Sequence, residues 1–347
     1  TAIDNPTPYH GCKPFDKVTG RFLASSSKKP TFPKVFGKHL LEMAQNDPSI
    51  VAVTPAMPAG SCLEPFMEAY PDRCLDVGIA EGHSVTFCGG IAKKGPLKVV
   101  CSIYATFLQR ALDNLFHDVC LQEIPVVFAI DRAGISAADG STHHGIYDIS
   151  FLQAMPNMVI CQPRNAQLLK ELLESCFSWN RPVALRYPNR ATDEPSGPLK
   201  PRPMGQGEVL LEGSRLVLIG LGYMSEVALE VQTKLQAHGI DATVVDPIFV
   251  KPLDSELFYR LFSSHTHVVT LEEHALNGGL GSAINSFAAQ NQFSELKILN
   301  LGVPDTFLEQ GSHNDVLAEI GLTPDQMTKT IVQEFSALIP SKAGSHP

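Results

Sequence analysis

The sequence of 347 residues lacks any apolar run close to the length of about 18 residues that a membrane-spanning helix needs. It also lacks an excess of basic residues, because 27 Lys and Arg stand against 36 Asp and Glu, which gives a formal net charge of −9. Proteins that bind nucleic acids generally neutralise phosphates with Lys and Arg, so this balance argues against that class. With 44% hydrophobic residues, we expect a soluble globular chain with no membrane and no nucleic-acid partner.

Paired CxxC motifs are absent as well, and no cysteine follows residue 180. The eight cysteines are Cys12, Cys62, Cys74, Cys88, Cys101, Cys120, Cys161 and Cys176. Several lie in apolar, strand-like segments, which favours buried reduced thiols over disulfides or zinc ligands. The first residues lack the basic and apolar regions of a signal peptide. Together these features predict a cytoplasmic protein.

The length suggests two domains at about 150 residues each. Residues 191–206, ATDEPSGPLKPRPMGQ, are polar and rich in proline, which is typical of a linker. We therefore expect an extended linker over residues 1–33, a first domain over 34–190, the linker 191–206, and a second domain over 207–340.

Short runs rich in β-branched residues alternate with amphipathic segments in both predicted domains. In the first domain these runs are SIVAVTP, RCLDVGI, KVVCSIYA, PVVFAIDRAG, NMVICQP and PVALRYP, and in the second RLVLIGLG, DATVVDP, HVVTLEEH and LKILNLG. This alternation predicts βαβ units and parallel sheets. The fold class is thus α/β, with two doubly wound domains in series. Ligands of such sheets lie beyond the carboxyl ends of the strands, so polar residues that directly follow a strand are candidates for a site.

One carboxylate, Glu81, lies in the small and apolar run DVGIAEGHSVTFCGGIA. Burial disfavours the charged form of an acid, so an acid in such surroundings needs a partner or shares a proton. Glu81 is therefore a candidate acid/base group. The alternative is a structural acid that caps a helix or forms a buried ion pair.

Further candidates follow the next strands. The segment YATFLQR places Tyr104, Phe107 and Arg110 at the expected start of a helix, where Phe107 and Arg110 share a face. The polar loop DRAGISAADGSTHHGIYD combines an arginine, an aspartate and two histidines: Arg132, Asp139, His143 and His144. A loop that carries acid, base and cation on a rigid scaffold is often functional. From the residues alone, Phe107 can equally be a core residue and Arg110 a partner in a salt bridge.

Two other segments carry weaker signals. RYPNR contributes Arg186 and Arg190 after the last strand of the first domain. EEHALNGGLGSA holds Gly278, Gly279 and Gly281, which we interpret as turn and close-packing residues rather than an anion site.

Nine segments, in the order in which they occur along the chain, resemble those of the transketolase-like thiamine diphosphate enzymes. Among these enzymes, they resemble the 1-deoxy-D-xylulose-5-phosphate synthases. The segments are TPAMPAGS, DVGIAEGHSVTF, IYATFLQRALDNLFHDV, FAIDRAG, DGSTHHGIYD, RYP, VVDPIFVKPLD, NGGLGS and GVPDTFLEQGS. The resemblance covers the pyrimidine-binding and C-terminal domains of that family. The family's N-terminal domain, which holds the Mg²⁺ ion and the diphosphate of the cofactor, has no counterpart here. This implies a fragment or one subunit of a split enzyme, with no metal ligands in this chain.

The resemblance also implies roles for individual residues. Glu81 hydrogen-bonds a ring nitrogen of the aminopyrimidine of thiamine diphosphate, Phe107 stacks on that ring, and His83 and Ile79 are secondary cofactor contacts. The residues that contact the acceptor substrate, D-glyceraldehyde 3-phosphate, are then Tyr104, Arg110, Arg132, Asp139, His143 and Arg190. Arginine suits a phosphate because its planar fork of N–H groups pairs two oxygens. The catalytic set is then Glu81, His143 and Asp139.

Two departures from the family pattern bear on these roles. Gly82 stands where the family usually has glutamine, and Asn189 followed by Arg190 stands where it usually has an arginine directly after RYP. The first removes a side-chain contact near the cofactor. The second leaves the anchoring of the phosphate to Arg190.

The implied reaction decarboxylates pyruvate and joins the remaining two-carbon unit to D-glyceraldehyde 3-phosphate, giving 1-deoxy-D-xylulose 5-phosphate and CO2. The resemblance further implies a homodimer, and a chain that is catalytically silent without the N-terminal domain, on the same or a separate polypeptide. The alternatives are the β-type subunit of a 2-oxo acid dehydrogenase first component, a transketolase C-terminal subunit, and a non-catalytic homologue that uses these domains for dimerisation or regulation. Arg110, Arg132 and the DGSTHHG loop favour the sugar-phosphate acceptor. The presence of Glu81, Phe107 and His143 together argues against a non-catalytic homologue.

Overall fold

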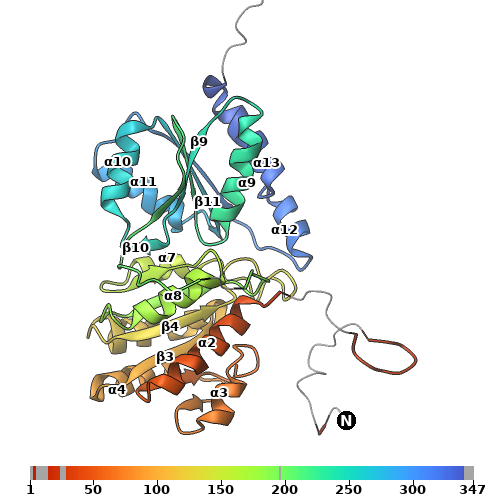
Figure 1. Cartoon of the computed structure of the whole chain (residues 1–347), viewed down its shortest axis with the longest axis vertical. Helices are drawn as coiled ribbons and strands as arrows, with labels where there is room; N and C mark the ends of the chain where they lie inside the picture. Colours follow the sequence, from red (N-terminus) through yellow and green to blue (C-terminus); the bar gives the residue numbers. More distant parts are fainter. Residues whose placement is uncertain (1–2, 5–14, 24–28, 195–196, 340–347) are drawn as a thin grey trace, which may run out of the picture.

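The computed structural model describes residues 3–4, 15–23, 29–194 and 197–339. These residues form two α/β domains stacked end to end, one sheet in each (Figure 1). The predicted fold class is therefore confirmed. Much of the expected linker at residues 1–33, and Cys12 within it, lies outside the described residues.

The first domain is built around a seven-stranded sheet with the order β10-β5-β6-β4-β3-β1-β2. Its own strands, all parallel, are β1 (Ile50–Thr54), β2 (Cys74–Asp76), β3 (Lys98–Tyr104), β4 (Val126–Asp131), β5 (Val159–Cys161) and β6 (Val183–Tyr187). Its main helices are α2 (Phe32–Asn46), α3 (Glu64–Ala69), α4 (Glu81–Lys94), α7 (Asp148–Gln153) and α8 (Ala166–Cys176). Each strand run predicted from the sequence contains one of these strands.

Local sequence explains why α8 forms where it does. The Asn165 side chain accepts a hydrogen bond from the Leu168 amide at 3.1 Å, which satisfies one of the unpaired N–H groups at a helix start. The leucines of α8 recur on one face of the helix and are fully buried. The described cysteines behave as expected: all are free thiols, six of them buried and Cys62 partly exposed.

The second domain has a five-stranded sheet with the order β12-β11-β8-β9-β7. Its strands are β7 (Glu208–Leu211), β8 (Leu216–Gly220), β9 (Ala242–Asp246), β11 (His267–Ala275) and β12 (Lys297–Val303). Its helices are α9 (Met224–Gln236), α10 (Ser255–Ser264), α11 (Leu280–Gln290), α12 (His313–Glu319) and α13 (Pro324–Glu334). In Figure 1, α10 and α11 cover one face of this sheet and α9 and α13 the other. The edge strand β7 is antiparallel to β9 and was not predicted from the sequence.

One strand from the second half of the chain crosses to the other domain. Residues Phe249–Lys251 form β10, which pairs antiparallel with β5 at the edge of the first sheet. Phe249 is 1% exposed and belongs to the core of the first domain. A second core is continuous across the junction, since it joins Ile149 and Leu152 to residues of β8 and α10. The two sheets are therefore held together by shared packing as well as by the connecting chain.

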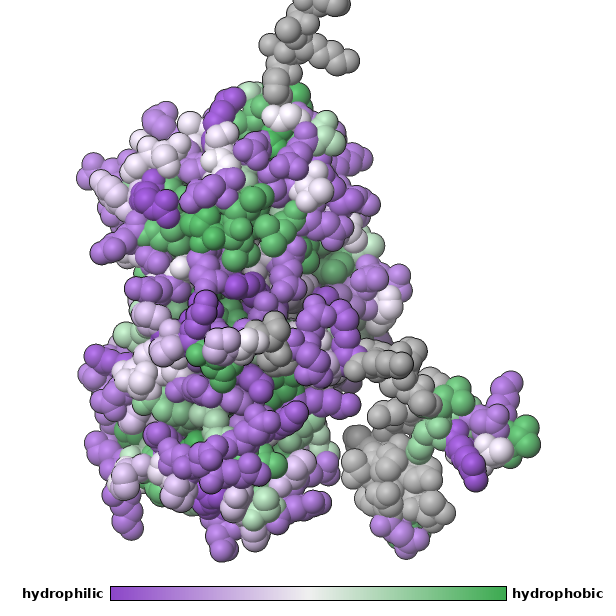
Figure 2. Space-filling view, viewed as in Figure 1, coloured by the Kyte–Doolittle hydropathy of each residue, from purple (hydrophilic) through white to green (hydrophobic). Residues whose placement is uncertain are grey.

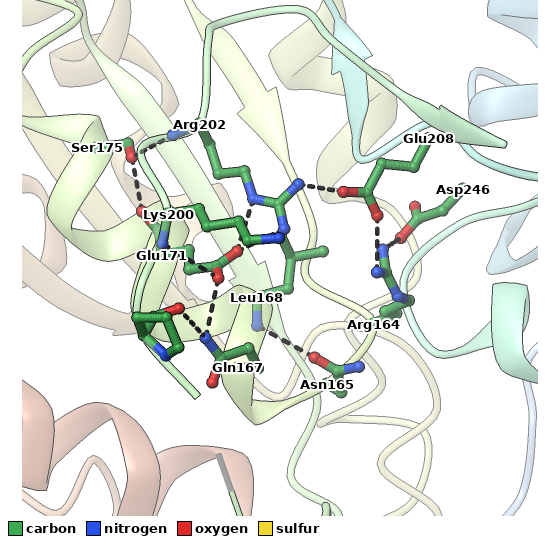
Figure 3. A network of polar contacts seen from close by, with 11 residues as sticks. Arg164, Asn165, Gln167, Leu168, Glu171, Ser175, Lys200, Arg202, Glu208 and Asp246 are labelled. Atoms are coloured by element: carbon green, nitrogen blue, oxygen red, sulfur yellow. Dashed lines mark hydrogen bonds and ion pairs between the residues drawn. The ribbon is translucent and has the colours of Figure 1, made fainter. Parts of the chain in front are cut away.

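A network of ion pairs closes the same junction (Figure 3). Arg202, which lies within the proline-rich segment, donates from Nε to Glu171 Oε2 of α8 at 2.6 Å and from Nη1 to Glu208. Arg164 pairs with the other oxygen of Glu208 and with Asp246, both at 2.7 Å. Burial raises the pKa of Asp246 to about 6, although Arg164 opposes this shift. Arg202, within the linker predicted at residues 191–206, thus connects the two domains.

Hydrophilic and hydrophobic residues are distributed unevenly over the surface (Figure 2). Figure 2 shows hydrophilic residues along the junction and a band of hydrophobic residues higher on the second domain. None of the helices in the described part of the chain combines the length and the hydropathy needed to cross a bilayer.

We predict that Arg202→Met lowers the free energy of unfolding by about 2 to 4 kcal/mol, because it leaves the buried Glu171 carboxylate, 2% exposed, without its cation. The matched control is Lys200→Met, which removes the same charge two residues earlier from an exposed position. The control is expected to change stability by less than about 0.5 kcal/mol. Urea denaturation of both variants measures the difference, and equal stabilities would show that the network does not stabilise the junction.

Candidate functional site

The candidate residues collect at the carboxyl ends of neighbouring strands of the first sheet, as expected for an open α/β sheet. Glu81 is the first residue of α4, which follows β2, and Tyr104 is the last residue of β3. Arg132 directly follows β4. The segment after β3 is not one continuous helix, because Ala105–Leu108 is α-helical and Gln109–Ala111 is a 3-10 turn.

Glu81 is buried and paired with an arginine. The residue is 6% exposed, and Arg110 Nη1 donates to its Oε1, whereas the Arg110 side chain is 56% exposed. No described residue hydrogen-bonds the second carboxylate oxygen, Oε2. The positive end of the α4 dipole also favours a carboxylate in the first turn. Glu81 therefore combines a stabilised negative charge with one oxygen available to a ligand.

Aromatic side chains surround this pair. The guanidinium of Arg110 lies 5.0 Å from the centroid of the Phe107 ring. Phe107 stacks on Tyr104 with centroids 5.4 Å apart, and the His143 ring meets Phe107 edge to face at 5.4 Å. Glu81, Arg110, Phe107, Tyr104 and His143 thus form one continuous cluster, although they come from three separate segments of the sequence.

Arg132 extends the cluster and is held firmly in place. Its guanidinium lies 4.2 Å from the Tyr104 centroid, and Nη1 donates to Gly60 O at 2.9 Å and to Asp131 Oδ2 at 2.6 Å. Asp131 also accepts from the Arg132 amide, which fixes a left-handed backbone with φ of 57°. Burial raises the pKa of Asp131 to about 7, against the opposing charge of Arg132. Burial likewise raises the pKa of Tyr104 well above its usual range, so its phenol stays neutral.

The loop after β4 presents its polar residues on different sides. His143 faces Phe107, and its Nδ1 lies 2.8 Å from Thr142 Oγ1. Asp139 is exposed and accepts from Ser136 Oγ at 2.9 Å. His144 is buried, and its Nδ1 accepts from the Ser136 amide at 3.0 Å, which makes it a structural histidine. Burial lowers the pKa of His144, so it is neutral near pH 7.

Several other candidates lie outside this cluster. Ile79 is 83% exposed, and His83 is exposed and stacks on Phe87. The guanidinium of Arg190 lies over Tyr223 of the second domain, 3.6 Å from the ring centroid. Arg186 is buried and bonded by Nε and Nη2 to both oxygens of Asp148, at 2.6 and 2.8 Å, which is a structural pair.

Gly82 and the glycine-rich turn show close packing. A Cβ at Gly82 would lie 2.7 Å from the Asn114 side chain, so the glutamine usual in the family cannot be accommodated without a shift. A Cβ at Gly279 would lie 2.2 Å from Glu272, and Gly278 has φ of 80°. The turn and close-packing interpretation of these glycines is therefore confirmed.

Two residues that shape the cluster, Asp131 and Gly60, were not predicted from the sequence. Asp131 is the last residue of a fully buried strand, and an acid at the end of such a run is a usable signal. Gly60 lies in TPAMPAGS, but only the structure shows that its carbonyl receives Arg132. Within the described residues no group of three or more His, Cys, Asp or Glu side chains is arranged to hold a metal ion.

We predict that Gly60→Ala destabilises the chain by about 1 to 3 kcal/mol through overpacking, because its Cβ would lie 2.1 Å from Tyr104 Oη. Adding Tyr104→Phe should restore part of the loss by removing the clashing oxygen. Gly90→Ala in α4 is the control, since its Cβ meets nothing within 4 Å and it should stabilise by about 0.5 to 1 kcal/mol. Thermal or urea unfolding measures the stability of these variants. A Gly60→Ala variant as stable as the parent would contradict this packing.

Comparison with known proteins identifies both domains. Residues 28–194 match the family model for the transketolase pyrimidine-binding domain, and residues 205–327 match that for the transketolase C-terminal domain. Among curated proteins, the 1-deoxy-D-xylulose-5-phosphate synthase of Chlamydia muridarum is 51% identical over 98% of this chain, and that of Chlamydia pneumoniae is 49% identical over 96%. The chain spans only 54% and 53% of these relatives, about half of their length.

Two solved structures share the fold. A protein described as a split-gene transketolase, in an inactive β4 tetramer, is 29% identical with a TM-score of 0.79, and the match covers 89% of this chain and 99% of that one. The transketolase of Campylobacter jejuni is 18% identical with a TM-score of 0.71, and the match covers 88% of this chain and 47% of that one. The chain therefore belongs to the transketolase family, of which it carries the pyrimidine-binding and C-terminal domains.

Proposed function

We propose that this chain provides the pyrimidine-binding and acceptor-binding part of a 1-deoxy-D-xylulose-5-phosphate synthase. The reaction decarboxylates pyruvate and joins the two-carbon unit to D-glyceraldehyde 3-phosphate, with release of CO2. One structural observation carries the proposal: the buried Glu81 carboxylate is joined through Arg110 to the ring contact between Phe107 and His143. The identity of about 50% to curated synthases over nearly the whole chain supports this substrate choice.

The residues present fit the aminopyrimidine of thiamine diphosphate. Oε2 of Glu81 is available to hydrogen-bond a ring nitrogen, and the partly exposed Phe107 ring can stack on a flat heterocycle. When bound, the cofactor supplies the carbanion chemistry of the reaction. The contribution of Glu81 is to hold a proton at the pyrimidine nitrogen and to orient the ring. Ile79 and His83, both exposed beside Glu81, are proposed as outer contacts of the cofactor.

The acceptor phosphate is assigned to Arg110 and Arg132. Arg110 uses Nη1 for Glu81 and keeps other N–H groups in solvent, while Arg132 is fixed by Gly60 and Asp131 with its Nη2 left out of these bonds. A guanidinium held in one orientation loses little entropy when it binds phosphate. Tyr104 lies between the two cations as a neutral phenol.

Asp139 and His143 are proposed to contact the hydroxyl groups of the acceptor. Imidazole can donate to and accept from an oxygen near neutral pH, so His143 suits proton transfer during ligation. Arg190 stays a candidate for the phosphate only through Nη1, which is buried and without a hydrogen-bond partner in the described chain. Its place over Tyr223 gives it a structural role as well.

The partners belong to the proposal too. We propose that a domain corresponding to the remaining length of the relatives, on the same or another polypeptide, holds the cofactor's diphosphate and Mg²⁺. The split-gene transketolase whose two-domain chain forms an inactive β4 tetramer supports the view that these two domains alone are silent. A homodimer of the complete enzyme and a cytoplasmic location complete the proposal, the latter supported by the free thiols.

The alternatives predict other acceptors or none. The β-type subunit of a 2-oxo acid dehydrogenase passes its product to a lipoyl group, for which two arginines around Tyr104 have no evident use. A non-catalytic homologue has no reason to keep an acid 6% exposed beside an aromatic pair.

We predict that this chain, mixed with the N-terminal half of the Chlamydia muridarum synthase, thiamine diphosphate and Mg²⁺, forms 1-deoxy-D-xylulose 5-phosphate from pyruvate and D-glyceraldehyde 3-phosphate. Neither half should do so alone. Glu81→Gln in this mixture should lower kcat by about 10²- to 10⁴-fold, the usual effect of losing a positioned acid/base group. Mass spectrometry of the product measures both results.

Glu68→Gln serves as the matched control, because Glu68 is an exposed acid of the same domain on α3. It should leave kcat within about twofold, as surface substitutions do. Replacing the aldehyde by lipoamide tests the competing acceptor. An assembled complex that binds thiamine diphosphate but makes product only with lipoamide, or whose Glu81→Gln variant keeps full activity, would contradict the proposal.

A further inference from the structure

The loop between β4 and α7, residues 132–147, carries Asp139 and His143 but is held largely by the second domain. Its base is closed within the first domain, where Gly134 and Gly145 exchange backbone hydrogen bonds of 2.8 Å and Thr106 Oγ1 donates to Thr142 O at 3.0 Å. Its outer part, residues 134–140, instead contacts β11 and the segment that precedes α12.

Glu273 of β11 makes the most buried of these contacts. The residue is 6% exposed, and its Oε2 accepts a hydrogen bond from the Ile135 amide at 3.1 Å. Gly134 has φ of 93°, and a Cβ there would lie 2.6 Å from Glu273 Oε2, so glycine is required for the carboxylate to come this close. A carboxylate that accepts from a backbone amide makes a stronger hydrogen bond than a neutral acceptor does.

The segment before α12 adds two hydrogen bonds to the outer part of the loop. Gln310 Nε2 donates to Ala138 O at 2.8 Å, and the Gly311 amide donates to Ala137 O at 3.0 Å. Ile135 and Ala137 are also buried in the hydrophobic core of the second domain. The residue that follows these contacts in the chain is Asp139, so the second domain fixes the backbone that presents it.

Glu273 is itself oriented by other residues of the junction. His313 Nε2 lies 2.9 Å from Glu273 Oε1 and 3.1 Å from Tyr223 Oη. Tyr223 is 4% exposed and carries the Arg190 guanidinium on its ring. Glu273 Oε1 makes no hydrogen bond within the described residues, so the Glu273 side chain is held by its burial, by the nearby His313 and by the hydrogen bond from Ile135 to Oε2.

We propose that Glu273 is a positioning residue of the acceptor site: together with Gln310 and Gly311 it lets the second domain hold the loop that presents Asp139 and His143. This inference rests on the proposed function, because it assigns a task in acceptor binding to a domain that contributes none of the clustered residues. Glu273 hydrogen-bonds the loop backbone and none of the clustered side chains, so its effect on Asp139 and His143 passes through the position of the loop. Its charge also interacts with that of Arg190.

Amide hydrogen exchange of the 347-residue chain by itself tests the clamp without any activity. Glu273→Ala should speed exchange across residues 134–140 by about tenfold, the effect of losing about one hydrogen bond, while peptides of β8 keep the parent rate. Glu273→Gln should return exchange toward the parent rate, because its amide oxygen can still accept from Ile135. Glu319→Ala, an exposed acid at the end of α12, should change neither region.

Gln310→Ala provides a second variant in case Glu273→Ala does not fold, since Gln310 is exposed and loses only its bond to Ala138. It should also speed exchange of the loop, by a smaller factor. If the folded variants exchange the loop at the parent rate, the inference is overturned.

The reconstituted enzyme gives the second readout. Glu273→Ala should raise KM for D-glyceraldehyde 3-phosphate by about tenfold, in line with a loosened acceptor loop, and leave KM for pyruvate within about twofold. Equal changes in both KM values would overturn the assignment to the acceptor. If the parent mixture makes no product while the exchange results hold, the proposed function fails and the clamp stands. If product forms but exchange is unchanged, the clamp fails and the function stands.

Discussion

Buried carboxylates that need a cation are the constraint on which this structure depends. An ionised carboxylate taken out of water is unstable unless a positive charge and hydrogen bonds compensate it. This chain meets the need with arginine in five places, at the site and at the domain junction. The pairs are Glu81 with Arg110, Asp131 with Arg132, Asp148 with Arg186, Glu171 with Arg202, and Asp246 with Arg164. In the last four pairs the arginine is mostly buried and its partner is nearly inaccessible, whereas Arg110 is half exposed and can also reach a ligand.

The junction and the site are parts of one arrangement. Strand β10 and a shared hydrophobic core seat the second domain against the first sheet, and this places β11 beside the loop after β4. The loop presents His143 to Phe107 on one side and receives Glu273 and Gln310 on the other. A change at the junction is thereby connected, through a few hydrogen bonds, to the position of the residues proposed to bind the acceptor.

Patterns local in the sequence were predicted well, and contacts across the chain were not. The strand runs and the place of Glu81 after β2 follow from hydrophobic patterning and from the position of a lone acid in an apolar run. Strand β10 was missed because its pairing with β5 joins residues of the two predicted domains, which no local pattern encodes. The place of Arg190 over Tyr223, and that of Glu273 beside Ile135, join residues far apart in sequence, so no local pattern encodes them.

The central claim is that the free oxygen of Glu81 faces the pyrimidine ring of thiamine diphosphate. A crystal structure of the reconstituted complex with the cofactor tests it most directly. The account predicts Glu81 Oε2 within about 3 Å of a pyrimidine nitrogen, a hydrogen-bond distance, with the Phe107 ring stacked on the pyrimidine. A cofactor bound with its pyrimidine away from Glu81, whose carboxylate then contacts only Arg110, would contradict it.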